Sequence, residues 1–120
     1  LATTSGEGFA RTLALDLRQA RDRTISTGDD HYVLMQRTAG AVTSYSVYRD
    51  TGGGAVQVDR QVMVPRGVTV TSGSDEWRFS FDGSLAGGAG TGTISVTGPH
   101  YTWTLTASLA TGSVRMTKSP

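Results

Sequence analysis

The sequence predicts an α+β fold, in which one N-terminal amphipathic helix packs on two antiparallel β-sheets. Two observations predict it. Apolar residues recur at steps of three or four only near the N-terminus, and after residue 30 they alternate with polar residues at a step of two. The resulting short strands follow one another at a spacing of about ten residues, which is typical of two packed antiparallel sheets.

Composition and charge indicate one ordinary globular domain over residues 1–120. The chain is 37% hydrophobic and 18% charged, and it is long enough for one core but too short for two. Its net charge of +1 gives no overall electrostatic reason to expect a nucleic acid or an anionic membrane as a partner. The absence of cysteine excludes disulfides, thiolate metal ligands and a thiol nucleophile.

The helix is predicted over residues 7–27, after a small, polar and frayed start at residues 1–6. Its apolar stripe falls within about a quarter-turn of the helix and consists of Phe9, Leu13, Leu17, Ala20 and Thr24. Gly28 supplies the positive φ that commonly ends a helix. This stripe, with Leu13, Leu17 and Ala20 at its centre, is expected to lie against a sheet.

The β-rich part is predicted over residues 31–118, without a second helix. Residues 32–37 are apolar on both faces, which predicts a strand in the middle of a sheet. The valines at 56, 58, 62 and 64 all fall at even-numbered positions and would point to one face of a strand. This region is therefore either one bent strand or a tight hairpin. The alternating positions expected in the core are Tyr45, Val47, Val56, Val58, Val62, Val64, Val68, Val70, Trp77, Phe79, Phe81, Ile94, Val96, Tyr101, Trp103, Leu105, Ala107, Val114 and Met116.

The aromatic residues at 77–81 and 101–103 allow a second interpretation. A carbohydrate-binding sandwich would present such rings on one open face, whereas a helix that covers a sheet requires them in the core. The helix favours the core.

No constellation of residues indicates catalysis, a metal or a cofactor. His31 and His100 are expected to be exposed loop histidines, because neither has a glutamate or cysteine at metal-ligand spacing. The acidic pairs at 29–30 and 75–76 lack the alternation of a calcium loop and are expected to be solvated turn residues. The glycine-rich segment 87–92 is followed by a strand, so it is predicted to be a hairpin connection and not a phosphate loop. We therefore expect a chain that is not an enzyme and has no small-molecule substrate.

Three blocks of sequence resemble a known family when they are taken in order. They are the helix at 13–28 with the apolar strand that follows it, the block 77–83 (Trp-Arg-Phe-Ser-Phe-Asp-Gly), and the closing hairpin at 112–115 (Gly-Ser-Val-Arg). Together they are similar to H-type minor pseudopilins of type II secretion systems and to FimT-like minor type IV pilins, and they span nearly the whole chain.

The resemblance implies a structural subunit that is anchored in the cell inner membrane by one hydrophobic N-terminal helix. In this family a prepilin peptidase removes a short leader, and the hydrophobic half-helix packs in the filament core. This chain would then be the polar half-helix and the head domain, on the periplasmic side, without the anchor. The expected partners are other pseudopilins or pilins of the same filament. The helix residues expected to meet complementary charges on those partners are Arg11, Arg18, Asp22 and Arg23.

Three functions stay open on the sequence. The first is a minor pseudopilin that takes part in filament assembly and protein export. The second is a minor type IV pilin that takes part in pilus assembly or DNA uptake, and the third is a carbohydrate-binding or adhesin module. Some FimT-like pilins carry a Gly-Arg-x-Arg motif, but here Ser113 replaces the first arginine, which leaves Arg115 and Lys118 as weak candidates for DNA contact. Nucleic acid is therefore not expected as a partner.

Overall fold

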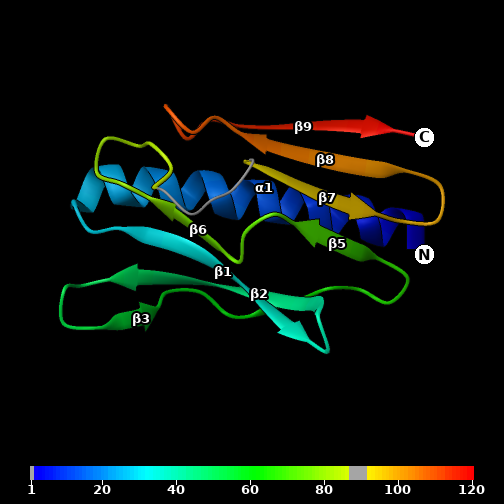
Figure 1. Cartoon of the computed structure of the whole chain (residues 1–120), viewed down its shortest axis with the longest axis horizontal. Coiled ribbons are helices and arrows are strands. Elements are labelled where there is room, and N and C mark those ends of the chain that lie inside the picture. The colour runs from blue at the N-terminus through cyan, green and yellow to red at the C-terminus, as the bar shows by residue number, and fades with distance from the viewer. Residues whose placement is uncertain (1, 87–91) are drawn as a thin grey trace.

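The computed structural model describes residues 2–86 and 92–120, with side chains from residue 6 onward. The chain forms one helix, α1 (Ala2–Thr27), and in these described ranges it forms nine strands and no second helix. Figure 1 shows α1 running along the length of the molecule behind the two sheets, with both chain termini at one end. The predicted α+β class, with one helix on two antiparallel sheets, is confirmed.

Each sheet is antiparallel throughout. The first sheet has the order β3-β2-β1-β6, with β4 also paired to β2, and comprises β1 (His31–Thr38), β2 (Ala41–Asp50), β3 (Ala55–Gln57), β4 (Val62–Met63) and β6 (Glu76–Phe79). The second has the order β5-β7-β8-β9 and comprises β5 (Thr69–Ser72), β7 (Thr93–Thr97), β8 (Thr102–Ala107) and β9 (Val114–Ser119). The first strand lies between two others, as its apolar faces predict.

The helix begins at Ala2, so the predicted start at residue 7 is wrong. Polar residues and two glycines form weak helix in isolation, but packing on a core stabilises a helix more than intrinsic propensity does. Gly6 is buried, and a Cβ at this position would lie 2.7 Å from the ring of Trp103. The predicted end is confirmed, because Gly28 has a φ of 80° and its N–H donates to the Thr24 carbonyl at 2.9 Å.

The valine-rich region at 55–64 is one interrupted strand and not a hairpin. Both β3 and β4 pair antiparallel with β2, with Gln57 opposite Tyr48 and Val62 opposite Tyr45. The Val58 N–H still donates to the Val47 carbonyl of β2 at 3.0 Å, and residues 59–61 leave the ladder between these pairings. The interruption brings Asp59 beside the helix, where it pairs with Arg23.

The helix stripe and the inner faces of both sheets form the core. Leu13, Leu17 and Ala20 are buried as predicted, as are Trp77, Phe79 and Trp103. Burial of these rings on the inner faces removes most of the open aromatic face that a carbohydrate-binding module would need.

Phe81 and Val56 were expected in the core but are 74% and 53% exposed. The strand β6 ends at Phe79, and a turn closed by the Gly83 N–H and the Ser80 carbonyl (2.8 Å) directs Phe81 outward. Val56 lies in β3, an edge strand whose three residues are all exposed.

Leu85 is a core residue that the alternation did not indicate. It is buried and forms an isolated bridge with Phe79 after the turn at 80–83. The glycine-rich connection at 87–92 lies outside the described residues except for Gly92, so the expectation for this segment is not tested.

Candidate interaction surface

The charged residues of α1 lie on two flanks of the helix and not on one face. Arg18 and Arg23 are five positions apart, which separates their side chains by about 140° around the helix axis. Arg18 Nη2 donates to the Val114 carbonyl at 2.9 Å, on β9, whereas Arg23 Nη1 lies 3.0 Å from Asp59 Oδ2, between β3 and β4. Figure 1 shows β9 and β3 along opposite edges of the molecule, so each arginine joins the helix to a different sheet.

Arg11 and Asp22 lie on the same flank of α1 as Arg18. Arg11 forms an ion pair with Glu7 at 3.6 Å, one turn earlier, and its side chain is exposed. Asp22 lies 3.6 Å from Arg21 Nη1 and is also exposed. These two side chains are thus open to a partner, while Arg18 is tethered by β9 and Arg23 is engaged by Asp59.

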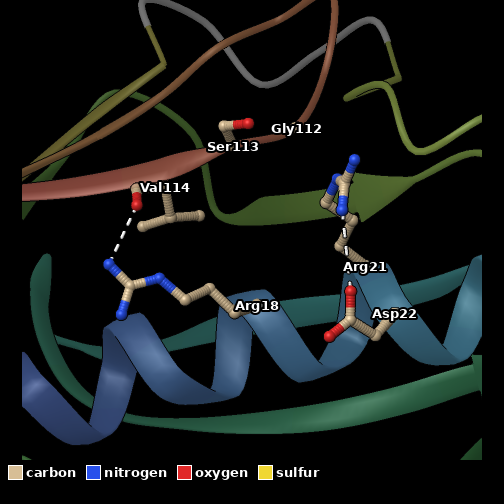
Figure 2. Close-up of a pocket in the computed structure, with 6 residues that line it drawn as sticks. All are labelled: Arg18, Arg21, Asp22, Gly112, Ser113 and Val114. Atoms are coloured by element: carbon tan, nitrogen blue, oxygen red, sulfur yellow. Dashed lines mark hydrogen bonds and ion pairs between the residues drawn. The ribbon is translucent and has the colours of Figure 1, made fainter.

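A pocket of about 300 Å³ lies between this flank and the start of β9. Arg21 lines it beside Arg18, and its Nε donates to the Thr111 carbonyl at 2.7 Å. Figure 2 shows both guanidinium groups reaching from the helix toward the strand, with Gly112 and Ser113 above them. No local pattern in the sequence indicates Arg21, because its partner Thr111 is 90 residues away in the chain.

Gly112 allows the turn at 111–113 to lie close to the Gly83 carbonyl and to the Arg21 side chain at this pocket. Its φ is 73°, a conformation that side chains disfavour. A Cβ there would collide with the Gly83 carbonyl oxygen and would lie 3.1 Å from Arg21 Cδ. Any larger residue would therefore push the turn at 111–113 away from the helix.

Arginine side chains neutralise the acidic pairs. Asp29 pairs with Arg49 at 2.7 Å and Asp75 pairs with Arg37 at 2.7 Å. Arg78 lies within 3.3 Å of Asp30 and 3.0 Å of Glu76. Across residues 2–86 and 92–120, no group of histidine, cysteine and acidic residues is arranged to hold a metal ion.

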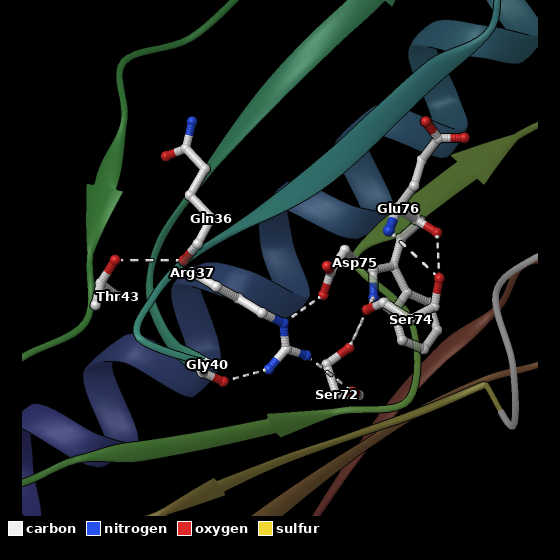
Figure 3. Close-up of polar contacts among 9 residues, drawn as sticks. Gln36, Arg37, Gly40, Thr43, Ser72, Ser74, Asp75 and Glu76 are labelled. Carbon is white, nitrogen blue, oxygen red and sulfur yellow. Dashed lines mark hydrogen bonds and ion pairs between the residues drawn. The ribbon is translucent and has the colours of Figure 1, made fainter.

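Arg37 joins the first sheet to the connection between β5 and β6 (Figure 3). Its guanidinium donates to Asp75 Oδ1 at 2.7 Å, to the Gly40 carbonyl at 2.9 Å and to the Ser72 carbonyl at 3.3 Å. Ser72 Oγ in turn accepts a hydrogen bond from Trp77 Nε1 at 3.1 Å. This cluster fixes two loops, and the carboxylate of Asp75 is engaged by Arg37.

His31 was expected to be exposed but is 2% exposed. Its backbone N–H donates to Thr24 Oγ1 at 2.8 Å, and its ring Nδ1 lies 2.9 Å from the Asp29 carbonyl. The hydroxyl of Thr24 thereby fastens the helix end to the first strand. His100 is exposed, as predicted.

Arg115 and Lys118 lie on β9 but do not converge. Arg115 stands opposite Thr106 on the exposed face of the second sheet. Lys118 stands opposite the buried Trp103, and its Nζ lies 4.1 Å from the centre of the Tyr101 ring. The two candidate DNA contacts therefore point to opposite faces of one strand.

These features define a class of protein. One long helix lies across two antiparallel sheets, which is the architecture of a pilin-like head domain. Within residues 2–86 and 92–120, no helix combines the length and the apolar character that a membrane crossing requires.

Residues 10–112 match the family described as type II transport protein GspH, and the chain belongs to this family. A structure of the minor pseudopilin EpsH from the type 2 secretion system of Vibrio cholerae superimposes with a TM-score of 0.72 at 14% identity, over 94% of this chain and 96% of that chain. A crystal structure of EpsH from the type II secretion system of the same organism gives 0.70 at 13% identity, over 94% and 93%. A search of curated protein sequences finds no match.

Proposed function

We propose that this chain is a non-enzymatic minor pseudopilin that takes part in assembly of a type II secretion pseudopilus and in protein export. Its membership of the GspH family carries the proposal. The fold supports it, because it matches the minor pseudopilin EpsH over nearly the full length of both chains. The buried aromatic side chains and the ion-paired carboxylates of the described residues leave a structural role as the simplest one.

The partners in this proposal are other pseudopilins of the same filament. On the outward flank of α1, Arg11 and Asp22 are exposed, and Leu15 is 51% exposed between them. Charged and apolar side chains side by side suit a protein surface better than a small ligand. Arg18 borders this flank, whereas Arg23 would contribute through the Asp59 side of the head.

We place the domain on the periplasmic side of the inner membrane, as expected for a pseudopilin head. In the full-length protein, a single hydrophobic segment before residue 1 would anchor it there. The anchor would bring the subunit into the filament, and the head surfaces would select its neighbours.

Deletion of the gene in its host tests the function. We expect the exported proteins to accumulate in the periplasm and secretion to return when the full-length gene is supplied. Twitching motility and DNA uptake are measured in the same strains as controls. Normal secretion together with a loss of pili or of DNA uptake would contradict the proposal and would assign the chain to a type IV pilus.

A further inference from the structure

We propose that the pocket between α1 and the turn at 111–113 binds an acidic segment of a neighbouring pseudopilin. Arg18 and Arg21 would hold its carboxylates, and Ile25 and Phe81 would contact its apolar side chains. The inference rests on the proposed filament role, and it names the surface and the chemistry of the partner.

Two guanidinium groups are already positioned for an anion. Arg18 and Arg21 lie one turn apart on α1, and each is held by a backbone carbonyl of one short segment, at Val114 and Thr111. Each guanidinium has five N–H donors, and in the described residues each gives one hydrogen bond to these carbonyls. The remaining donors can bind carboxylate oxygens, and tethered side chains lose less entropy on binding than free ones.

Close backbone packing fixes Arg21 in particular. Gly83 has a φ of 88°, and a Cβ at this position would lie 3.2 Å from Arg21 Nε. Gly112 approaches the same side chain, with a Cβ position 3.1 Å from Arg21 Cδ. Two glycines from separate turns therefore pack against the Arg21 side chain, whose guanidinium lies at the pocket.

One apolar side chain, Ile25, borders Arg21, and a second, Phe81, lies two residues from Gly83. The Cβ position of Gly83 lies 3.1 Å from Ile25 Cδ1, and Ile25 is 47% exposed. Phe81 belongs to the same turn as Gly83 and is the most exposed of the large apolar side chains found exposed in the structure. Arginine and aromatic residues that lie together at a surface are typical of the energetic centres of protein interfaces.

The position of the surface fits contact with the next subunit. Figure 1 shows the C-terminal end of α1, the end of β6 and the turn that leads into β9 in the half of the molecule farther from the chain termini. In a filament whose subunits are joined through segments at the N-terminal end, this opposite half is free to meet a neighbour.

The chemistry favours an acidic protein segment over nucleic acid. Asp22 lines the pocket with the two arginines, so the three charges together leave one positive charge, which suits a single carboxylate better than a run of phosphates. Phe81 and Ile25 offer apolar surface that a phosphate chain does not use. Arg115, the nearest further cation on β9, lies on the exposed face of the second sheet, opposite Thr106. Two arginines with apolar neighbours match alternating acidic and apolar side chains.

The test titrates the 120-residue chain with the purified head domain of each other pseudopilin of the same secretion system, by calorimetry. We expect one head to bind, and Arg21→Gln and Phe81→Ser each to weaken binding about tenfold. Raising the salt from about 50 to about 300 mM should weaken wild type more than Arg21→Gln, because screening acts on the charged contact.

Matched variants control for surface change and folding. Arg66→Gln removes an exposed arginine on the connection between β4 and β5, and Met63→Ser removes an apolar side chain that is 60% exposed elsewhere. Both should bind within about twofold of wild type. Phe81→Ser keeps the hydrogen bonds of Arg18 and Arg21, so it tests the surface even where loss of Arg21 lowers the melting temperature.

The outcomes separate this inference from the filament role. If a head binds wild type and the Arg21 and Phe81 variants equally, the inference is wrong and the filament role stands. If no head binds but duplex DNA does, with loss in Arg21→Gln, the pocket serves nucleic acid and the inference is also wrong. The same two variants in the full-length gene should impair secretion, while failure of wild type to restore it would contradict the filament role itself.

Discussion

The hydroxyl of Tyr45 donates a hydrogen bond to Asp16 Oδ2 at 2.7 Å, which joins the second strand to the middle of the helix. Tyr45 is fully buried, and its ring meets that of Phe9 edge to face, with centres 5.7 Å apart. Burial, and then the bond to Asp16, raises the pKa of the Tyr45 hydroxyl, so it stays protonated as a donor. Asp16 in turn has a raised pKa, because burial outweighs the lowering that the bond from Tyr45 produces.

The raised pKa of Asp16 predicts the effect of removing its charge. A group with a raised folded-state pKa binds a proton more readily in the folded chain, so its ionised form lowers stability above the unfolded pKa. Asp16→Asn keeps an oxygen acceptor for Tyr45 and removes the charge. We expect a higher melting temperature than wild type at about pH 7 and a difference that shrinks toward about pH 3.

Asp82 provides a control, because its pKa is shifted in the direction opposite to that of Asp16. Hydrogen bonds from Ser84 lower the pKa of the Asp82 carboxyl, so its ionised form stabilises the folded chain above the unfolded pKa. Asp82→Asn should therefore lower the melting temperature at neutral pH and lose this effect in acid. A lower melting temperature for Asp16→Asn at neutral pH would mean that the charged hydrogen bond outweighs burial.

At Gly6, an alanine substitution is expected to change the free energy of unfolding in the direction opposite to helix propensity. Replacing a helical glycine with alanine ordinarily adds about 1 kcal/mol of stability. At Gly6, however, the new Cβ would lie 2.7 Å from Trp103 Cζ3, within the core. We expect Gly6→Ala to lower the free energy of unfolding by about 1–3 kcal/mol, as other overpacked core substitutions do.

Gly8 is the matched control for that substitution. It lies in the same helix, is exposed, and has nothing within 4 Å of its Cβ position. Gly8→Ala should therefore raise the free energy of unfolding by about 0.5–1 kcal/mol in the same denaturant titration. Equal effects of the two alanines would show that Trp103 does not pack on the first turns of α1.

Arg37 should contribute to stability through its three acceptors. Arg37→Ala removes the bonds to Asp75, Gly40 and Ser72, and we expect a loss of about 1–2 kcal/mol because the site is partly exposed. Arg37→Lys cannot make the forked contact and should recover only part of this. Arg66→Ala, at an exposed arginine, controls for loss of charge, and a similar loss there would contradict the role of the Arg37 contacts.

Local periodicity made most of the fold predictable. The stripe from Phe9 to Thr24 and the central first strand follow from spacing within one element, and both are confirmed. The exposure of Phe81 could not be read in this way, because it depends on where β6 ends and on the turn at 80–83. The helix start was missed for a related reason, since Trp103, nearly one hundred residues away, packs on Gly6.

The interaction surface was less predictable than the fold. The helical period separates Arg18 from Arg23, but what each side chain reaches, Val114 or Asp59, depends on how the sheets flank the helix. The burial of His31 depends likewise on the hydroxyl of Thr24, which bonds across seven residues at the helix end. Tertiary contacts of this kind leave no local pattern in the sequence.

The isolated domain is expected to be a monomer. Apart from Ile25 and Phe81, its large exposed apolar side chains are separated over α1, β3, β4 and a turn, so contacts between two copies of this head should remain below the roughly 1,200 Å² of a stable interface. Sedimentation at about 10–100 μM should give the mass of one chain, 12.6 kDa. A tight dimer at these concentrations would contradict the expectation that most filament contact comes from outside this domain.

DNA binding by the closing hairpin is expected to be weak. Arg115 is exposed, but Lys118 lies over the ring of Tyr101 on the other face of β9. A single strand that offers its two cations to opposite sides can neutralise at most about two phosphates, which gives a shallow dependence on salt and little affinity at physiological ionic strength. An anisotropy titration with duplex DNA at about 50 mM salt should show little binding below about 10 μM. Clear binding that Arg115→Ala abolishes, and that Arg66→Ala leaves intact, would contradict this prediction and favour a DNA-uptake pilin.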